Sequence, residues 1–112
     1  MDECIFCRIA NKSMVVEILY ENDHWVTIRD IHPQAEVHLL FISKNHYDSM
    51  ATIPRDSGAL LNALSSAISK VSSDLGLESY RLISNNGASA GQTVMHLHWH
   101  LLSGKGFSLD SL

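Results

Sequence analysis

Three histidines stand at alternate positions near the end of the chain, at His96, His98 and His100. Apolar and aromatic residues fill the positions between and after them, a density typical of a β-strand. Because side chains of a strand alternate between faces, we expect the three imidazoles to lie on one face, about 7 Å apart. Such a row can hold a catalytic metal or act directly through imidazole, and the pattern alone favours neither. Strand propensity alone does not favour three alternating histidines, which argues against a purely structural role.

Cys4 and Cys7 have the spacing of half a zinc site. In a reducing compartment, a Cys-x-x-Cys pair is more typical of metal-binding or redox chemistry than of a structural disulfide. Free cysteines are also common as buried residues, so the pair by itself leaves both interpretations open.

The length and composition set limits on the protein class. The 112 residues suffice for one domain with a core, and we expect a single domain over residues 1–112. With a formal charge of −4 there is no basic excess, so neither nucleic acid nor a membrane surface is an expected partner. Apolar runs such as residues 39–42 are too short to span a bilayer, and the acidic start does not resemble a signal peptide. We therefore expect a cytoplasmic protein.

The elements that position these residues mix strands with two helices. A short helix is expected at 4–10, strands at 15–20, 25–28, 37–42 and 80–84, and then the histidine strand. Apolar residues at three- and four-residue steps predict a long helix over 54–75, between Pro54 and Gly76. The order predicts an α+β fold, with a glycine-bearing loop at 85–91 whose backbone could approach an anion.

The histidine strand, with Gly91, Gln92, Thr93 and Val94 before it, resembles the histidine triad family of nucleotide hydrolases and transferases. Residues 30–35, 43–46 and 84–87 agree with the family in order, and the resemblance covers residues 4–105. It is closest to the nucleotide-binding phosphoramidase branch, whose members are small homodimers. The resemblance implies an antiparallel sheet of about five strands, one long helix and a short N-terminal helix, with two copies joining their sheets.

The same resemblance implies residue roles. His98 is the expected nucleophile on the α-phosphorus, His100 hydrogen-bonds phosphate oxygens, and His38 sits beside His98 and supports it. The implied reaction passes through a covalent nucleotidyl-histidine and releases AMP from a purine nucleoside 5′-phosphoramidate, and it needs no metal for the chemistry. The remaining contacts correspond to Asp30 for the ribose, to Phe6, Ile9, Ile28, Ile31 and Leu40 for the base, and to Asn85, Gly91, Gln92 and Thr93 for the phosphate.

Some family members carry Cys-x-x-Cys and bind zinc with two further histidines. The matching residues are Cys4, Cys7, His46 and His96. Two thiolates and two imidazoles complete a tetrahedral shell, which implies a structural zinc. The alternative is two buried free thiols and a surface histidine.

Three other functions stay open from the sequence. The residues from Gly91 to Val94 also resemble dinucleoside polyphosphate hydrolases. A nucleotide-binding regulatory module with incidental catalysis, and a zinc hydrolase that uses the triad as catalytic ligands, are the others. The chain departs from the family at Ser43, where proline is usual, and at Trp99, which we expect to face away from the site.

Overall fold

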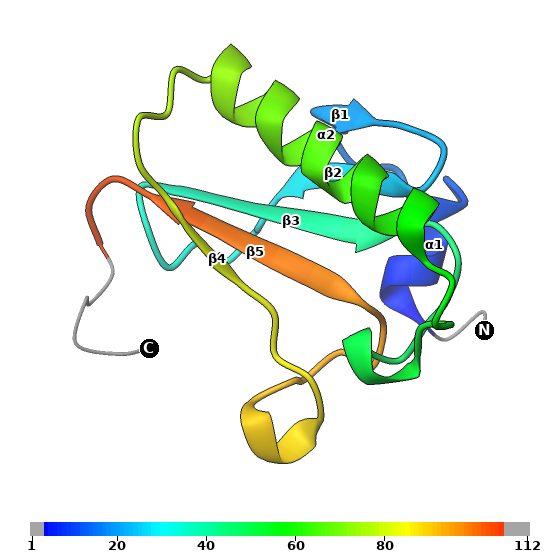
Figure 1. Ribbon diagram of the computed structural model, residues 1–112. Coiled ribbons are helices and arrows are strands. Elements are labelled where there is room, and N and C mark those ends of the chain that lie inside the picture. Colours follow the sequence, from blue (N-terminus) through cyan, green and yellow to red (C-terminus); the bar gives the residue numbers. More distant parts are fainter. Residues whose placement is uncertain (1–3, 107–112) are drawn as a thin grey trace.

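The computed structural model describes residues 4–106 (Figure 1). Its elements in chain order are α1 (Ile5–Ala10), β1 (Tyr20–Glu21), β2 (Trp25–Arg29), β3 (Val37–Ser43), the 3-10 turn η1 (Met50–Thr52), α2 (Gly58–Asp74), β4 (Arg81–Ile83), the 3-10 turn η2 (Ala88–Ala90) and β5 (His98–Ser103). The strands form one antiparallel sheet in the order β1-β2-β3-β5-β4. The expected α+β fold, with five strands, one long helix and one short N-terminal helix, is confirmed.

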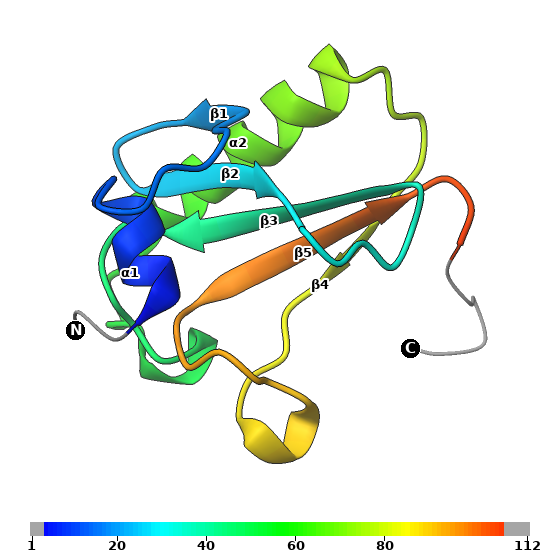
Figure 2. The ribbon, with the colours of Figure 1, turned by 180° about the vertical axis from the view of Figure 1, so that it is seen from behind.

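The two helices cover opposite faces of this sheet. α2 lies across one face in Figure 1, and the view from behind in Figure 2 shows α1 on the other. Side-chain alternation divides the apolar residues accordingly. The face under α2 buries Trp25, Leu39, Phe41, Leu60, Leu64, Ala67, Val71, Leu97 and Leu101. The face under α1 buries Phe6, Ile9, Val26, Ile28, Leu40 and Ile42. The central strands are therefore apolar on both sides.

The long helix is shorter than the sequence pattern predicts. It begins at Gly58 instead of near Pro54, and the Ser57 hydroxyl donates a hydrogen bond to the Pro54 carbonyl in the preceding turn. Most of its apolar stripe is buried, including Leu60, Leu64 and Val71. Leu61 and Leu75, also expected in the stripe, are 39% and 38% exposed. Among the described residues 4–106, no helix is long and apolar enough to cross a membrane.

Two strand predictions need correction. Of the expected strand at 15–20, only Tyr20 belongs to a strand, and it begins β1 (Tyr20–Glu21). The alternating residues Met14, Val16 and Ile18 instead pack onto the core on the α1 side, so their periodicity reflects burial without strand pairing. The histidine strand begins at His98, so His96 lies just before β5.

Candidate active site and metal centre

A cavity of about 360 Å³ lies on the α1 face of the sheet. Its apolar lining comes from Ile5, Phe6, Ile9, Met14, Val16, Ile28, Ile31, Leu40 and Val94, and its polar lining from Arg29, Asp30, His32, Thr93, His98 and His100. A largely apolar cavity with a few polar groups is the usual form of a small-molecule site. Ile31 is 82% exposed, as suits a residue at the opening of the cavity.

The sheet register places His98 and His100 in this cavity. His100 pairs with Leu40 and His98 with Ile42, so both imidazoles share the face that carries the α1-side core. Their ring centroids are 5.1 Å apart. Phe6 of α1 stands edge-on to His98, with its centroid at 4.9 Å. The short helix therefore forms one wall of the imidazole site.

The orientation of His98 is fixed by a backbone group. Its Nδ1 lies 2.6 Å from the carbonyl oxygen of His96. Because a carbonyl only accepts, Nδ1 carries the proton and Nε2 keeps its lone pair. Burial lowers the pKa of His98 below its ordinary value, which keeps the ring neutral near pH 7. His98 thus has the form that a nucleophilic imidazole requires.

His38 lies against His100, whereas the family resemblance implies a position beside His98. Its Nε2 is 2.9 Å from Nδ1 of His100 and 3.4 Å from Oδ2 of Asp30. The register between β3 and β5 explains the difference. His38 pairs with Leu102, which is two residues from His100 and four from His98 along β5. Burial lowers the pKa of His38, and burial together with the neighbouring His98 and His38 lowers that of His100 to about 4.

A second cluster joins α1 to the loops beside β3 and β5. The ligand atoms of Cys4, Cys7, His46 and His96 all lie within 4.8 Å of one another. Nδ1 of His96 is 3.3 Å from Sγ of Cys4, and Nδ1 of His46 is 3.2 Å from Sγ of Cys7. Tetrahedral zinc, with Zn–S about 2.3 Å and Zn–N about 2.0–2.1 Å, separates its ligand atoms by roughly 3.3–3.8 Å. The cluster fits a metal ion of this kind.

The outer contacts of this cluster also fit a metal. Nε2 of His96 lies 2.7 Å from the carbonyl oxygen of Ser43, and Nε2 of His46 lies 3.0 Å from Oδ1 of Asp48. Both histidines therefore hold a proton on Nε2 and turn an unprotonated Nδ1 to the sulfurs, as metal-bound histidines do. Burial raises the pKa of the Cys7 thiol to about 11, with the Cys4 sulfur adding to the shift. A bound cation would displace that proton.

Three residues expected at the phosphate do not line the cavity. Gln92 is buried, and its side-chain amide accepts from the Gly87 N–H and donates to the carbonyls of Asp48 and Val94. This amide therefore holds the loop before β5. Gly91 has φ of 97° and faces Asn85, whose Cγ lies 3.9 Å from the position a Cβ would take. The phosphate roles of these three residues stay predictions.

Sequence reasoning missed several contributors. Met14, Val16 and Val94 line the cavity, and the alternation at residues 14–18 was the available signal for the first two. Ser43 and Asp48 support the cluster of cysteines and histidines through His96 and His46. In the sequence, Ser43 and Asp48 look like ordinary turn residues near His46, and no pattern marks them as supports of the cluster.

The comparisons with known proteins agree with this geometry. Residues 11–107 match the HIT domain family. The chain belongs to the HIT family. An uncharacterised HIT-like protein of Synechocystis sp. is 39% identical over 108 residues, covering 96% of this chain and 95% of the relative. Protein HitA of Neisseria gonorrhoeae is 37% identical, covering 91% of this chain and 96% of its own.

Solved HIT structures share the whole architecture. A HIT family hydrolase from Clostridium thermocellum superposes with a TM-score of 0.91 at 39% identity, covering 100% of this chain and 99% of that one. A histidine triad protein from Clostridium difficile gives a TM-score of 0.89 at 37% identity, covering 96% and 95%. Cys4 and Cys7 lie before the residues matched to the HIT domain.

Proposed function

We propose that this HIT protein hydrolyses purine nucleoside 5′-phosphoramidates, and releases AMP through a covalent nucleotidyl intermediate on His98. The observation that carries the proposal is the hydrogen bond from His98 Nδ1 to the His96 carbonyl, 2.6 Å long, within a cavity of about 360 Å³. It leaves a neutral imidazole with its nucleophilic nitrogen free in a site of nucleotide size. The description of the C. thermocellum relative as a hydrolase supports the reaction class.

The cavity lining suits the parts of a nucleotide. The apolar side chains of Phe6, Ile9, Ile28, Ile31 and Leu40 offer surfaces for a purine. Asp30 also lines the cavity; its Oδ1 accepts the His32 N–H at 2.8 Å, which holds the carboxylate for the ribose hydroxyls. His100 and Thr93 lie on the polar lining and offer donors to the phosphate.

The reaction proceeds in two displacements. Nε2 of His98 attacks the α-phosphorus, the P–N bond breaks, and the amine leaves with the proton that its basic bridging nitrogen carries. Water then attacks phosphorus and gives a proton to solvent, the bond from phosphorus to Nε2 breaks, and AMP departs. Neutral donors around the phosphoryl oxygens stabilise the charge that develops there.

We further propose that Cys4, Cys7, His46 and His96 hold a structural zinc. When bound, the metal supplies a cross-link and takes no part in the displacement. His96 contributes its ring Nδ1 to the cluster and its backbone carbonyl to His98. This residue therefore positions the nucleophile from within the metal shell.

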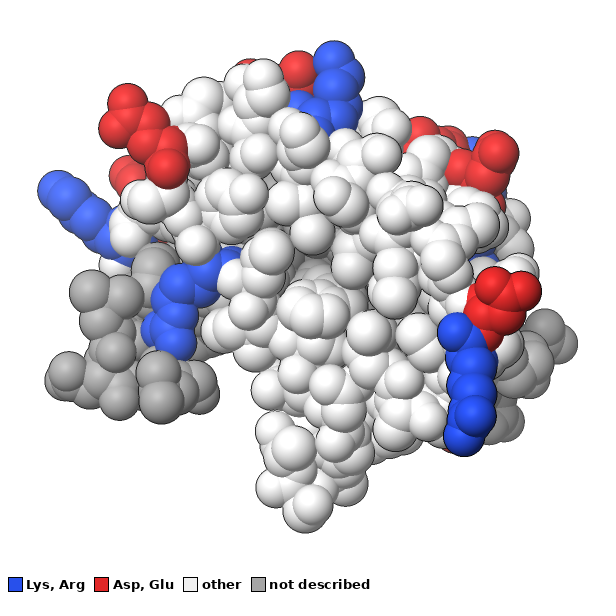
Figure 3. Space-filling view, viewed as in Figure 1, with Lys and Arg blue, Asp and Glu red and all other residues white. Residues whose placement is uncertain are grey.

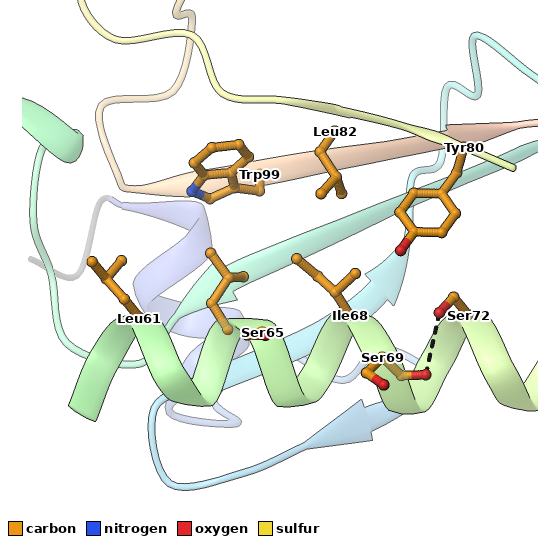
Figure 4. A pocket seen from close by; sticks show the side chains of 9 residues that line it. Leu61, Ser65, Ile68, Ser69, Ser72, Tyr80, Leu82 and Trp99 are labelled. Carbon is orange, nitrogen blue, oxygen red and sulfur yellow. Dashed lines mark hydrogen bonds between the residues drawn. The ribbon is translucent and has the colours of Figure 1, made fainter. Parts of the chain in front are cut away.

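We also propose a homodimer formed through the face that carries α2 and β4. A groove of about 490 Å³ lies there, lined by Leu61, Leu64, Ser65, Ile68, Ser69, Ser72, Tyr80, Leu82 and Trp99 (Figure 4). Leu61 and Leu82 are 39% and 40% exposed, and β4 is an edge strand. Lys, Arg, Asp and Glu lie toward the rim of this face and leave its middle uncharged (Figure 3). An apolar face beside an open sheet edge suits a second copy of the same chain.

The deciding experiment measures hydrolysis of adenosine 5′-phosphoramidate by the wild type and His98→Ala, each with and without a chelator. His24→Ala, a histidine outside the cavity lining, is the matched control. We expect turnover by the wild type and the control, none by His98→Ala, and initial rates that survive chelation. Immediate loss on chelation with the fold intact would show a catalytic metal instead. Turnover of a dinucleoside polyphosphate alone, or binding without turnover, would support the other two alternatives.

A further inference from the structure

We propose that His38 and the backbone N–H of Gln34 are positioning groups that fix His100 in the tautomer with its proton on Nε2. His100 then presents a hydrogen-bond donor to the phosphate. The inference rests on the proposed function for its catalytic meaning, while the tautomer itself follows from hydrogen bonds that need no substrate.

The first step is the protonation of His38. The Gln34 N–H lies 2.9 Å from Nδ1 of His38. A backbone N–H can only donate, so this nitrogen must offer a lone pair. Since burial lowers the pKa of His38 and keeps the ring neutral, its single proton sits on Nε2.

The second step passes this constraint to His100. Nε2 of His38 lies 2.9 Å from Nδ1 of His100, but 3.4 Å from Oδ2 of Asp30. The shorter contact has the length of a normal hydrogen bond, and the longer one exceeds it. His38 therefore donates to His100. Nδ1 of His100 accepts, and its own proton lies on Nε2.

The outcome is a pair of adjacent imidazoles in opposite tautomers. His98 has its proton on Nδ1 and a lone pair on Nε2, because a carbonyl faces Nδ1. His100 has the reverse arrangement, because a donor faces Nδ1. Phosphoryl oxygens only accept hydrogen bonds, so a His100 lone pair turned toward them would repel. The hydrogen bonds from the Gln34 N–H to His38 and from His38 to His100 prevent the His100 tautomer that would have this lone pair on Nε2.

The same hydrogen bond argues against a metal at this place. Side-chain ligand atoms of Asp30, His38 and His100 lie close enough together to suggest a cation site. Coordination through Nε2 of His38 would require the proton on Nδ1, but Nδ1 already accepts the Gln34 N–H. The three residues are better matched to a hydrogen-bond chain.

The test uses the full chain, loaded with zinc and labelled with ¹⁵N in its histidine rings. We expect nuclear magnetic resonance to show an unprotonated Nδ1 and protonated Nε2 for His100, and the reverse for His98. The Gln34 amide proton should correlate with Nδ1 of His38 through the hydrogen bond. A protonated Nδ1 on His100 would overturn the proposal.

Two substitutions separate this role from a structural one. His38→Gln places an amide donor near the position of Nε2, whereas His38→Leu removes it. We expect His38→Leu to shift the His100 tautomer and to lower kcat about 10- to 100-fold with a smaller change in KM, less than the loss of an oxyanion donor itself. His38→Gln should recover most of the rate. Gln34→Ala keeps the backbone N–H and should leave the tautomers unchanged.

The outcomes distinguish this inference from the proposed function. An unchanged His100 tautomer in a folded His38→Leu protein overturns the positioning role. The expected tautomers in a wild type that hydrolyses no phosphoramidate uphold this inference and overturn the proposed function.

Discussion

His98 and His100 are the same side chain two positions apart on one strand, yet their Nδ1 atoms face different partners. One faces a backbone carbonyl at 2.6 Å, and the other faces Nε2 of a third imidazole at 2.9 Å. A carbonyl dictates a tautomer by itself, whereas an imidazole does so only through its own partner. The protonation of His100 should therefore respond to changes in residues farther away than that of His98.

The low pKa of His100 predicts a loss of stability in acid. Its folded pKa is about 4, against about 6.5 for an ordinary histidine. The unfolded chain thus takes up the proton first, so this contribution to stability is complete above about pH 6.5 and is lost as the pH falls toward 4. By pH 5 the loss is at most about 2 kcal/mol. Urea unfolding at several pH values should show a shallower decline for His100→Gln than for the wild type. Identical declines would contradict the assignment.

Asp30 should govern recognition of the sugar. Asp30→Asn keeps an oxygen to accept the His32 N–H, but removes the charge that strengthens hydrogen bonds to ribose hydroxyls. We expect kcat/KM to fall about 10- to 100-fold, since such bonds contribute about 1.5–3 kcal/mol. A substrate with a 2′,3′-dideoxyribose should lose little in the variant, because those bonds are already absent. Asp23→Asn, at an exposed turn, is the control. Equal losses on both sugars would place the role of Asp30 elsewhere.

At the level of elements, the short helix α1 depends for its stability on contacts with the rest of the protein. Six residues are too few for a stable isolated helix. Phe6 and Ile9 bury its inner face, and the Cys4 and Cys7 sulfurs meet His96 and His46. Because Phe6 also contacts His98, the proposed metal centre and the proposed nucleotide cavity share this helix.

Metal removal should therefore loosen the cavity as well as the fold. We expect a chelator to lower Tm by at least about 5 °C, which corresponds to roughly 1 kcal/mol for a chain of this size. On prolonged chelation KM should rise more than kcat falls, because the wall formed by Phe6 loosens. The double variant Cys4→Ser, Cys7→Ser should have the lower Tm without any chelator, and the chelator should not change its Tm further. A wild type whose Tm is unaffected and which holds no zinc by elemental analysis would exclude the metal centre.

Local sequence patterns predicted the strands and the helix whose apolar residues form continuous runs or recur at regular spacing. Runs of apolar and β-branched residues identified β2 and β3, alternation identified the histidine strand, and the apolar stripe identified α2. The partner of His38 could not be predicted, because it depends on which residue of β5 lies opposite it. The role of Gln92 could not be predicted for the same reason, because its side-chain amide turns inward and hydrogen-bonds three backbone groups. Both depend on contacts between segments that are distant in sequence.

For the whole molecule, the proposed dimer gives a direct test. Leu82→Lys puts a charge in the groove between α2 and β4, and we expect it to shift sedimentation from dimer toward monomer with the fold retained. Leu75→Lys is the matched control, because Leu75 is 38% exposed, close to the 40% of Leu82, but does not line the groove. A wild type that sediments as a monomer would exclude this interface.

Because side chains alternate along β5, this one strand contributes both to the proposed dimer groove and to the cavity that holds the imidazoles. Trp99 and Leu101 of the strand, and Leu97 just before it, turn toward α2, while His98 and His100 turn toward the cavity. Substitutions at His98 and His100 should therefore affect turnover, whereas substitution of the buried Leu101 should affect the stability of the fold and that of Trp99, which lines the groove, should affect assembly. An insertion or deletion of one residue would exchange the two sets, placing imidazoles in the core and leucines in the cavity. Natural variation in the length of this protein should accordingly be confined to the loops outside β5.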